Sequence, residues 1–65
     1  MNSTQLLDYL INNDCELLLA NQETDAILEV ARDNGLVVDL DTVLAAYKLT
    51  ELDPYYAKYV KPLAN

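Results

Sequence analysis

The chain has 65 residues, which is room for one domain with a small core, and 52% of them are apolar. Eleven acidic side chains oppose four basic ones, so the formal net charge is −7. A chain of this charge repels nucleic acid and anionic membrane surfaces, because phosphate binding needs clustered Lys and Arg. Chains of this size rarely bury enough surface to be very stable, so we expect marginal stability or stability gained from a partner.

The charge is unevenly distributed along the chain. All eleven acids lie at or before Asp53, which leaves residues 1–53 with a charge of −9, whereas the remainder carries only two lysines. This change predicts two parts: an acidic helical recognition domain over residues 1–53, and a Tyr- and Lys-containing C-terminal helix or tail over residues 54–65.

Helical periodicity begins near the N-terminus. Asn2 or Ser3 is suited to cap a first helix, and with Asn2 as the cap Gln5 stands at the third helical position, as in a capping box. Asp14 is suited to cap a short second helix that ends near Asn21. The apolar positions of these helices are Leu6, Leu7, Leu10 and Ile11 in the first, and Cys15, Leu18 and Leu19 in the second.

A third helix has the clearest signals. Thr24 is a good cap, Asp25 suits the first turn, and Gly35 suits the left-handed position just beyond a helix end. The stretch 36–38 is predicted to be an extended connector that places apolar side chains in the core. The predicted buried stripe is Ile27, Leu28, Val30 and Ala31.

Two further helices complete the prediction. Asp39 or Asp41 caps a fourth helix, and Asp53 with Pro54 is a strong start signal for a fifth, which Pro62 stops. Residues expected to face inward from the fourth helix are Val43, Leu44, Tyr47 and the stem of Lys48. The predicted fold class is therefore all-α, a compact array of four to five short helices.

The sequence offers little material for chemistry. It has a single cysteine, Cys15, so an internal disulfide is excluded. It has no histidine, so a Cys–His nucleophile is excluded as well. The stretch Asp39-Leu40-Asp41 lacks the Gly and Glu that a calcium loop requires, so capping explains both aspartates better. We therefore expect a protein that is not an enzyme and that uses no metal or cofactor. The start does not resemble a signal peptide, and we expect a cytoplasmic location.

The tyrosines of the tail are candidate contacts for a protein partner. Tyr offers a large binding area at low entropic cost. Tyr55 and Tyr59 share one helical face and Tyr56 and Val60 the next, so one face could equally pack back on the core. The residues that we assign to partner binding are Tyr55, Tyr56, Lys58, Tyr59, Lys61, Asp39 and Asp41.

The order of several weak motifs resembles one known family. The relevant stretches are residues 6–10, 26–36, 41–44 and 49–53, including Ala31-Arg32-Asp33-Asn34-Gly35 and Leu49-Thr50-Glu51-Leu52-Asp53. Over residues 4–53 the chain resembles the Nif11-like leader domains, the leader regions of ribosomally synthesised, post-translationally modified peptides. The resemblance implies a body that a modifying enzyme recognises. Such leaders usually end in Gly-Gly, whereas this chain has only Gly35, and its residues 54–65 contain no Cys, Ser or Thr.

Two functions follow as expectations. The first is a non-catalytic protein-interaction domain, resembling a peptide-precursor leader that a modifying enzyme binds; any modification of the tail would then fall on Tyr, Lys, Asn or the backbone. The alternative is an acidic decoy or inhibitor of the phage type, which binds a basic, nucleic-acid-handling protein. Neither requires direct contact with nucleic acid or membrane, and an exposed Leu or Tyr patch could also form a homodimer.

Overall fold

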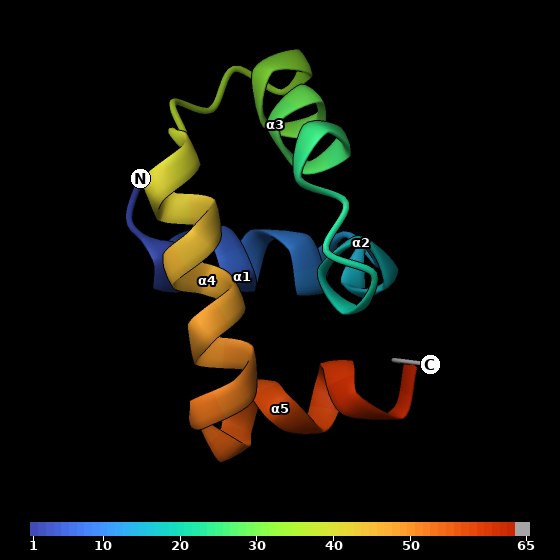
Figure 1. Ribbon diagram of the computed structural model, residues 1–65. Coiled ribbons are helices and arrows are strands. Elements are labelled where there is room, and N and C mark those ends of the chain that lie inside the picture. The colour runs from blue at the N-terminus through green and yellow to red at the C-terminus, as the bar shows by residue number, and fades with distance from the viewer. Residues whose placement is uncertain (64–65) are drawn as a thin grey trace.

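Helices account for nearly all of the structure, a computed structural model that describes residues 1–63 (Figure 1). This part of the chain confirms the predicted all-α array of short helices. Ala64 and Asn65, the end of the predicted tail, lie outside the described residues. The elements are α1 (Ser3–Asn12), α2 (Glu16–Ala20), α3 (Thr24–Asp33), α4 (Leu40–Leu52), α5 (Pro54–Val60) and a terminal 3-10 turn, η1 (Lys61–Leu63).

Three of the five helix starts use the caps that the sequence predicts. Asn2 and Gln5 form a reciprocal capping box at the start of α1. Asp39, rather than Asp41, caps α4, and its carboxylate accepts the Thr42 N–H. Asp53 caps α5, with Pro54 at the first helical position. These contacts span only two or three residues, which is why the sequence alone reveals them.

The starts of α2 and α3 differ from the prediction. Asp14 does not cap α2; it has a φ of 58°, and Cys15 takes the N-cap position without a side-chain hydrogen bond. Thr24 is the first residue of α3 rather than its cap, which is Glu23. The Thr24 hydroxyl instead shares a hydrogen bond of 2.9 Å with the hydroxyl of Tyr47 on α4. A tertiary contact has thus replaced the local one.

The first three helices end in the same backbone motif. In each case the residue beyond the cap is left-handed, with φ of 58° at Asp14, 51° at Gln22 and 72° at Gly35. The next N–H along the chain then bonds back to a carbonyl of the last helical turn, at 2.8 Å from Cys15, 2.9 Å from Glu23 and 2.8 Å from Leu36. Each of these left-handed residues ends its helix and turns the chain sharply before the next helix begins.

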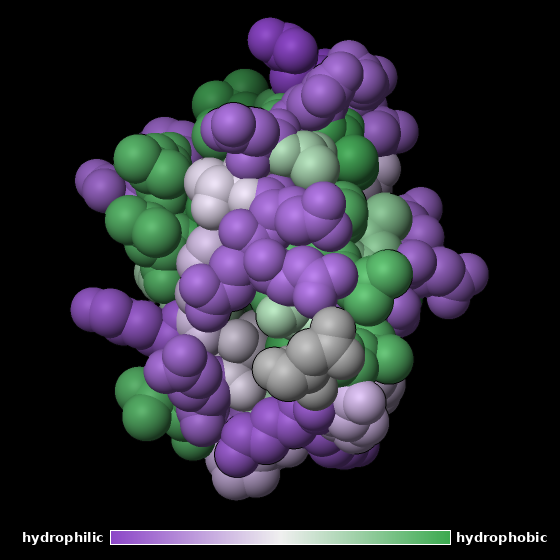
Figure 2. All heavy atoms as spheres, turned by 45° about the vertical axis from the view of Figure 1, so that its right-hand side comes forward, coloured by the Kyte–Doolittle hydropathy of each residue, from purple (hydrophilic) through white to green (hydrophobic). Residues whose placement is uncertain are grey.

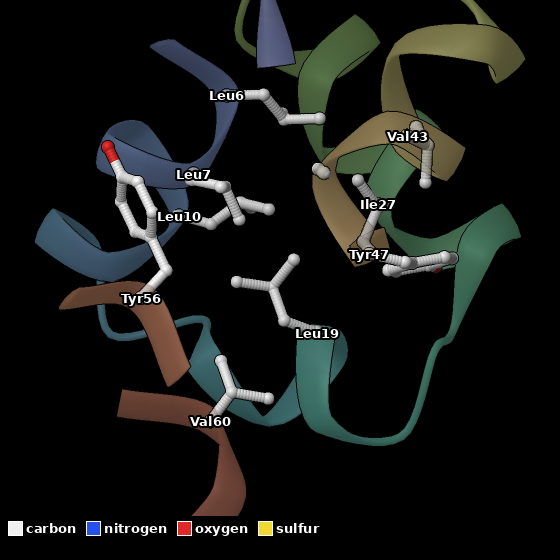
Figure 3. Packing of buried hydrophobic residues seen from close by; sticks show 10 residues of the cluster. Leu6, Leu7, Leu10, Leu19, Ile27, Val43, Tyr47, Tyr56 and Val60 are labelled. Atoms are coloured by element: carbon white, nitrogen blue, oxygen red, sulfur yellow. The ribbon is translucent and has the colours of Figure 1, made fainter. Parts of the chain in front are cut away.

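All five helices contribute to a single core (Figure 3). Leucines of α1 and α2 meet Ile27 of α3, Val43 and Tyr47 of α4, and Tyr56 and Val60 of α5. The segment after Asp53 therefore packs on the body as a final helix, and the division at that residue is one of charge rather than of packing. The largest side chains with almost no exposed surface are Leu6, Leu7, Leu10, Leu19, Ile27 and Val43.

Two predictions about burial are wrong. The connector between α3 and α4 does not deliver all its side chains to the core, because Val37 is 85% exposed while Leu36 and Val38 are half-buried. On α4, Leu44 and Lys48 point outward and are exposed. The inward positions of α4 are occupied instead by Val43, Ala46, Tyr47 and Thr50.

Candidate interaction surface

The α4 helix is apolar on two sides. Its inner side packs against α1, α3 and α5. On its outer side the exposed fractions are 51% for Leu40, 46% for Leu44 and 77% for Leu52. An amphipathic helix at a protein surface usually carries one apolar stripe, and a helix that is apolar all round is usually covered on all sides. The outer side of α4 therefore has the apolar composition of a helix face that packs against another element or a partner.

The exposed leucines are aligned along the helix. Leu40, Leu44, Lys48 and Leu52 follow one another at intervals of four residues, so they form one continuous ridge, which we call the α4 ridge. All four side chains are exposed. In Figure 2, hydrophobic side chains project from the left-hand edge of the molecule, with hydrophilic ones between them, on the side where Figure 1 places α4.

The N-terminal end of the α4 ridge is extended by two more apolar residues. The exposed Val37 lies just before α4, and its carbonyl accepts a hydrogen bond of 3.4 Å from the terminal amine of Met1. Met1 is itself exposed, and an unbranched Met side chain adapts readily to different partner shapes. Exposed apolar side chains thus lie before the start of α4 as well as on its outer side.

Carboxylates border this surface. Three carboxylates, those of Asp39, Asp41 and Glu51, are exposed on or beside α4. Two cationic groups lie in the same region, the side chain of Lys48 within the ridge and the terminal amine of Met1 beside Val37. The ridge is therefore an apolar strip in a negative setting, as the overall charge of −7 would suggest.

The capping hydrogen bonds of Asp39 stabilise its ionised carboxylate. One carboxylate oxygen accepts the Thr42 hydroxyl at 2.7 Å and the Thr42 N–H at 2.9 Å. These bonds favour the ionised form and hold the pKa of Asp39 below its usual value. Because its pKa is lower in the folded chain, ionised Asp39 stabilises the fold at any pH above the ordinary pKa of the group. That stability is lost as the pH falls through the folded pKa. At neutral pH, Asp39 therefore stays charged and the start of α4 stays capped.

A second exposed group lies on α5. Tyr55 is 53% exposed and its ring centroid lies 5.6 Å from that of Tyr59, which is half-buried. The ammonium of Lys58 lies 4.7 Å from the Tyr55 centroid and 5.2 Å from the Tyr59 centroid, within cation–π range. These three side chains form the outward face of the helix.

The residues assigned to partner binding do not form one site. Tyr55, Lys58 and Tyr59 lie together on α5, and Lys61 begins η1. Asp39 and Asp41 lie at the opposite end of α4 from α5 (Figure 1).

Tyr56 departs from the expected role. Its side chain is buried, and its hydroxyl donates to the Asp8 carboxylate at 2.9 Å. It therefore belongs to the core and not to an outward contact surface.

Helical periodicity does not identify the leucines of the α4 ridge as a surface. It predicts that Leu44 faces inward, and it assigns no role to Leu40 or Leu52. The signal that marks the ridge is the presence of apolar residues at nearly every angle around residues 40–52, more than a single buried stripe needs.

Residues 1–63 contain no pocket, and no group of three His, Cys, Asp or Glu side chains among them is close enough to hold a metal ion. None of the helices in this range has the length and apolar character needed to cross a membrane. Comparison with protein-family models, with curated proteins and with solved structures finds no match to this chain.

Proposed function

We propose that this chain is a non-catalytic protein-interaction domain, acting in the cytoplasm, which a partner protein binds along the α4 ridge. The observation that carries the proposal is the exposed line of Leu40, Leu44 and Leu52 on a helix whose opposite side already forms the core. Between about half and three-quarters of each leucine is exposed, so covering all three would contribute about 3 kcal/mol to binding.

In its more specific form, the partner is a peptide-modifying enzyme and the chain is a leader-like recognition domain. The support is the resemblance over residues 4–53 together with an exposed recognition surface within that range. In this form the side chains of α5 that an enzyme could reach without unfolding the helix are Tyr55 and Lys58, because Tyr56 is buried.

The test compares two leucines of equal exposure. Leu40 on the α4 ridge and Leu17 on α2 are 51% and 53% exposed, and both lie in the first turn of a helix. Leu40→Asn and Leu17→Asn baits, with the unchanged chain, are used for affinity purification from the native host, followed by mass spectrometry of bait and captured protein.

We expect the partner to be lost with Leu40→Asn and retained with Leu17→Asn, because only the first substitution places a polar group in the proposed contact. A mass increase on the α5 segment of the recovered chain would support the leader-like form. If both variants capture the same proteins in the same amounts as the unchanged chain, the α4 ridge is not the binding surface.

An acidic decoy is the second candidate, and one observation favours it. Asp25, Glu29 and Asp33 are exposed and follow one another at intervals of four residues along α3, which makes a carboxylate ridge. Replacement of these three residues by Asn, Gln and Asn should abolish capture through the carboxylate ridge of α3, whereas capture through the α4 ridge should persist and stay sensitive to Leu40→Asn. Unchanged capture in this variant would exclude the decoy.

A further inference from the structure

The chemistry of the α4 ridge specifies what should cover it. We infer that its occupant is an amphipathic helix of the partner protein whose apolar stripe is bordered by Lys or Arg. This inference rests on the proposed function and adds the chemical class of the partner.

The shape of the ridge argues for a helix. Side chains at intervals of four residues form the rows that interlock with the grooves of a second helix, most often at a crossing angle near −50°. The 13 residues of α4 span about 20 Å at 1.5 Å per residue, enough for three to four turns of a partner helix to lie across it. An added strand would instead require a sheet edge, and residues 1–63 are built from helices.

The charges beside the ridge argue for a basic helix. Three carboxylates, those of Asp39, Asp41 and Glu51, border the apolar strip, and basic side chains on the partner would lie opposite them. The charge of −7 on the whole chain adds a long-range attraction for a cationic segment.

The same charges disfavour a second copy of this chain as the occupant. Two copies would bring their bordering carboxylates and a net charge of −7 each into contact. The two occupants therefore respond to salt in opposite ways: added salt weakens binding of a basic helix and strengthens self-association of an acidic chain.

A substitution at Lys48 tests whether the charge beside the ridge controls binding. Lys48 lies within the α4 ridge and is the only basic side chain on α4, so after Lys48→Glu every charged side chain of α4 is acidic. Lys58→Glu on α5 changes the net charge of the chain by the same amount, but away from the ridge. The difference between these two variants isolates the contribution of the ridge from that of the overall charge.

The probes are two synthetic amphipathic helices of about 18 residues, or five turns, built from Leu with either Lys or Glu as the polar residue. Binding to the full chain is measured by fluorescence anisotropy at about 50 and 300 mM NaCl, which changes the screening length about 2.5-fold. Circular dichroism confirms that every variant is folded.

We expect the Lys peptide to bind, and the Glu peptide not to bind. Lys48→Glu should tighten binding of the Lys peptide about two- to fivefold, a typical effect for a partly exposed charge pair, and by more than Lys58→Glu does. Leu40→Asn should weaken binding about tenfold, and Leu17→Asn should leave it unchanged. Added salt should weaken binding throughout.

Three results would overturn the inference. They are equal binding of the Lys and Glu peptides, equal effects of Lys48→Glu and Lys58→Glu, and a dimer in sedimentation equilibrium that Leu40→Asn dissociates and salt strengthens. If any of these occurs while Leu40→Asn still loses the native partner, the proposed function stands and only the class of the partner is wrong. If Leu40→Asn retains the native partner, the proposed function itself fails.

Discussion

Tyr56 shows how one residue can join segments that are distant in sequence. Its ring is buried in the core, and its hydroxyl donates to Asp8 of α1, 48 residues away. Burial, and then the hydrogen bond to the nearby carboxylate, raise the pKa of Tyr56 to about 12. The helical spacing in the sequence separates Tyr55 and Tyr59 from Tyr56 and Val60 correctly, but it does not show which pair faces inward.

The Tyr56–Asp8 bond leads to a prediction for alkaline pH. Because the pKa of Tyr56 is raised from its ordinary value of 10, the protonated hydroxyl stabilises the fold below pH 10. That stability is lost as the pH rises from about 10 to about 12. Tyr56→Phe should lower the free energy of unfolding by about 1 kcal/mol at neutral pH, because one hydrogen bond is removed. The variant should then lose less additional stability than the unchanged chain between about pH 9 and pH 11.

Urea unfolding followed by circular dichroism at each pH measures both effects. Tyr55→Phe is the control at neutral pH, since Tyr55 is exposed and should be nearly neutral. An equal alkaline loss in Tyr56→Phe and the unchanged chain would mean that Tyr56 does not titrate as a buried group.

Among the elements, α2 is unusual because the left-handed residues that precede and follow it are both other than glycine. Asp14 and Gln22 both adopt this conformation, which disfavours side chains other than glycine by about 1–2 kcal/mol. The sequence contains one glycine, at the equivalent position after α3. The sequence therefore marks the end of α3 with a glycine, whereas for α2 it predicts an end near Asn21 without one.

The strain after α2 can be relieved by one substitution. Gln22→Gly should raise the free energy of unfolding by about 0.5–1 kcal/mol, because glycine adopts positive φ freely and this gain exceeds its entropic cost. Asn21→Gly is the matched control: Asn21 is the preceding residue, with a φ of −90°, and the substitution should be neutral or destabilising. Thermal unfolding of both variants checks the prediction, and equal stabilities would show that the conformation at Gln22 carries no strain.

For the whole molecule, stability depends on one core that all five helices share. A chain of 65 residues is expected to have an unfolding free energy of about 3–10 kcal/mol. Leu19→Ala should remove about 3 kcal/mol, since Leu19 is 1% exposed and its loss leaves a cavity among side chains from several helices. At the lower end of that range, part of the population would then be unfolded at ordinary temperatures.

Leu44→Ala is the matched control, because it removes the same atoms from the outer side of α4. We expect a change within about 0.5 kcal/mol, as is usual for an exposed position. Both free energies come from urea unfolding monitored by helical circular dichroism. A large loss with Leu44→Ala would show that the outer side of α4 is already packed in the free protein.

Features that depend on near neighbours along the chain can be predicted from the residues alone. Helical periodicity, the caps at Asn2 and Asp53, and the glycine turn at Gly35 all act within a few residues, so they predict the all-α class. The contacts of Thr24 with Tyr47 and of Tyr56 with Asp8 join residues 23 and 48 positions apart, and no local pattern signals them.

Which side of α4 faces outward depends on how the other helices pack against it. Both sides of that helix are apolar, so helical periodicity is equally compatible with either side facing the core. The choice is made by α1, α3 and α5, which cover Val43, Ala46 and Tyr47 and leave Leu40, Leu44 and Leu52 exposed. The candidate binding surface is thus the part of the apolar pattern that the fold itself does not bury.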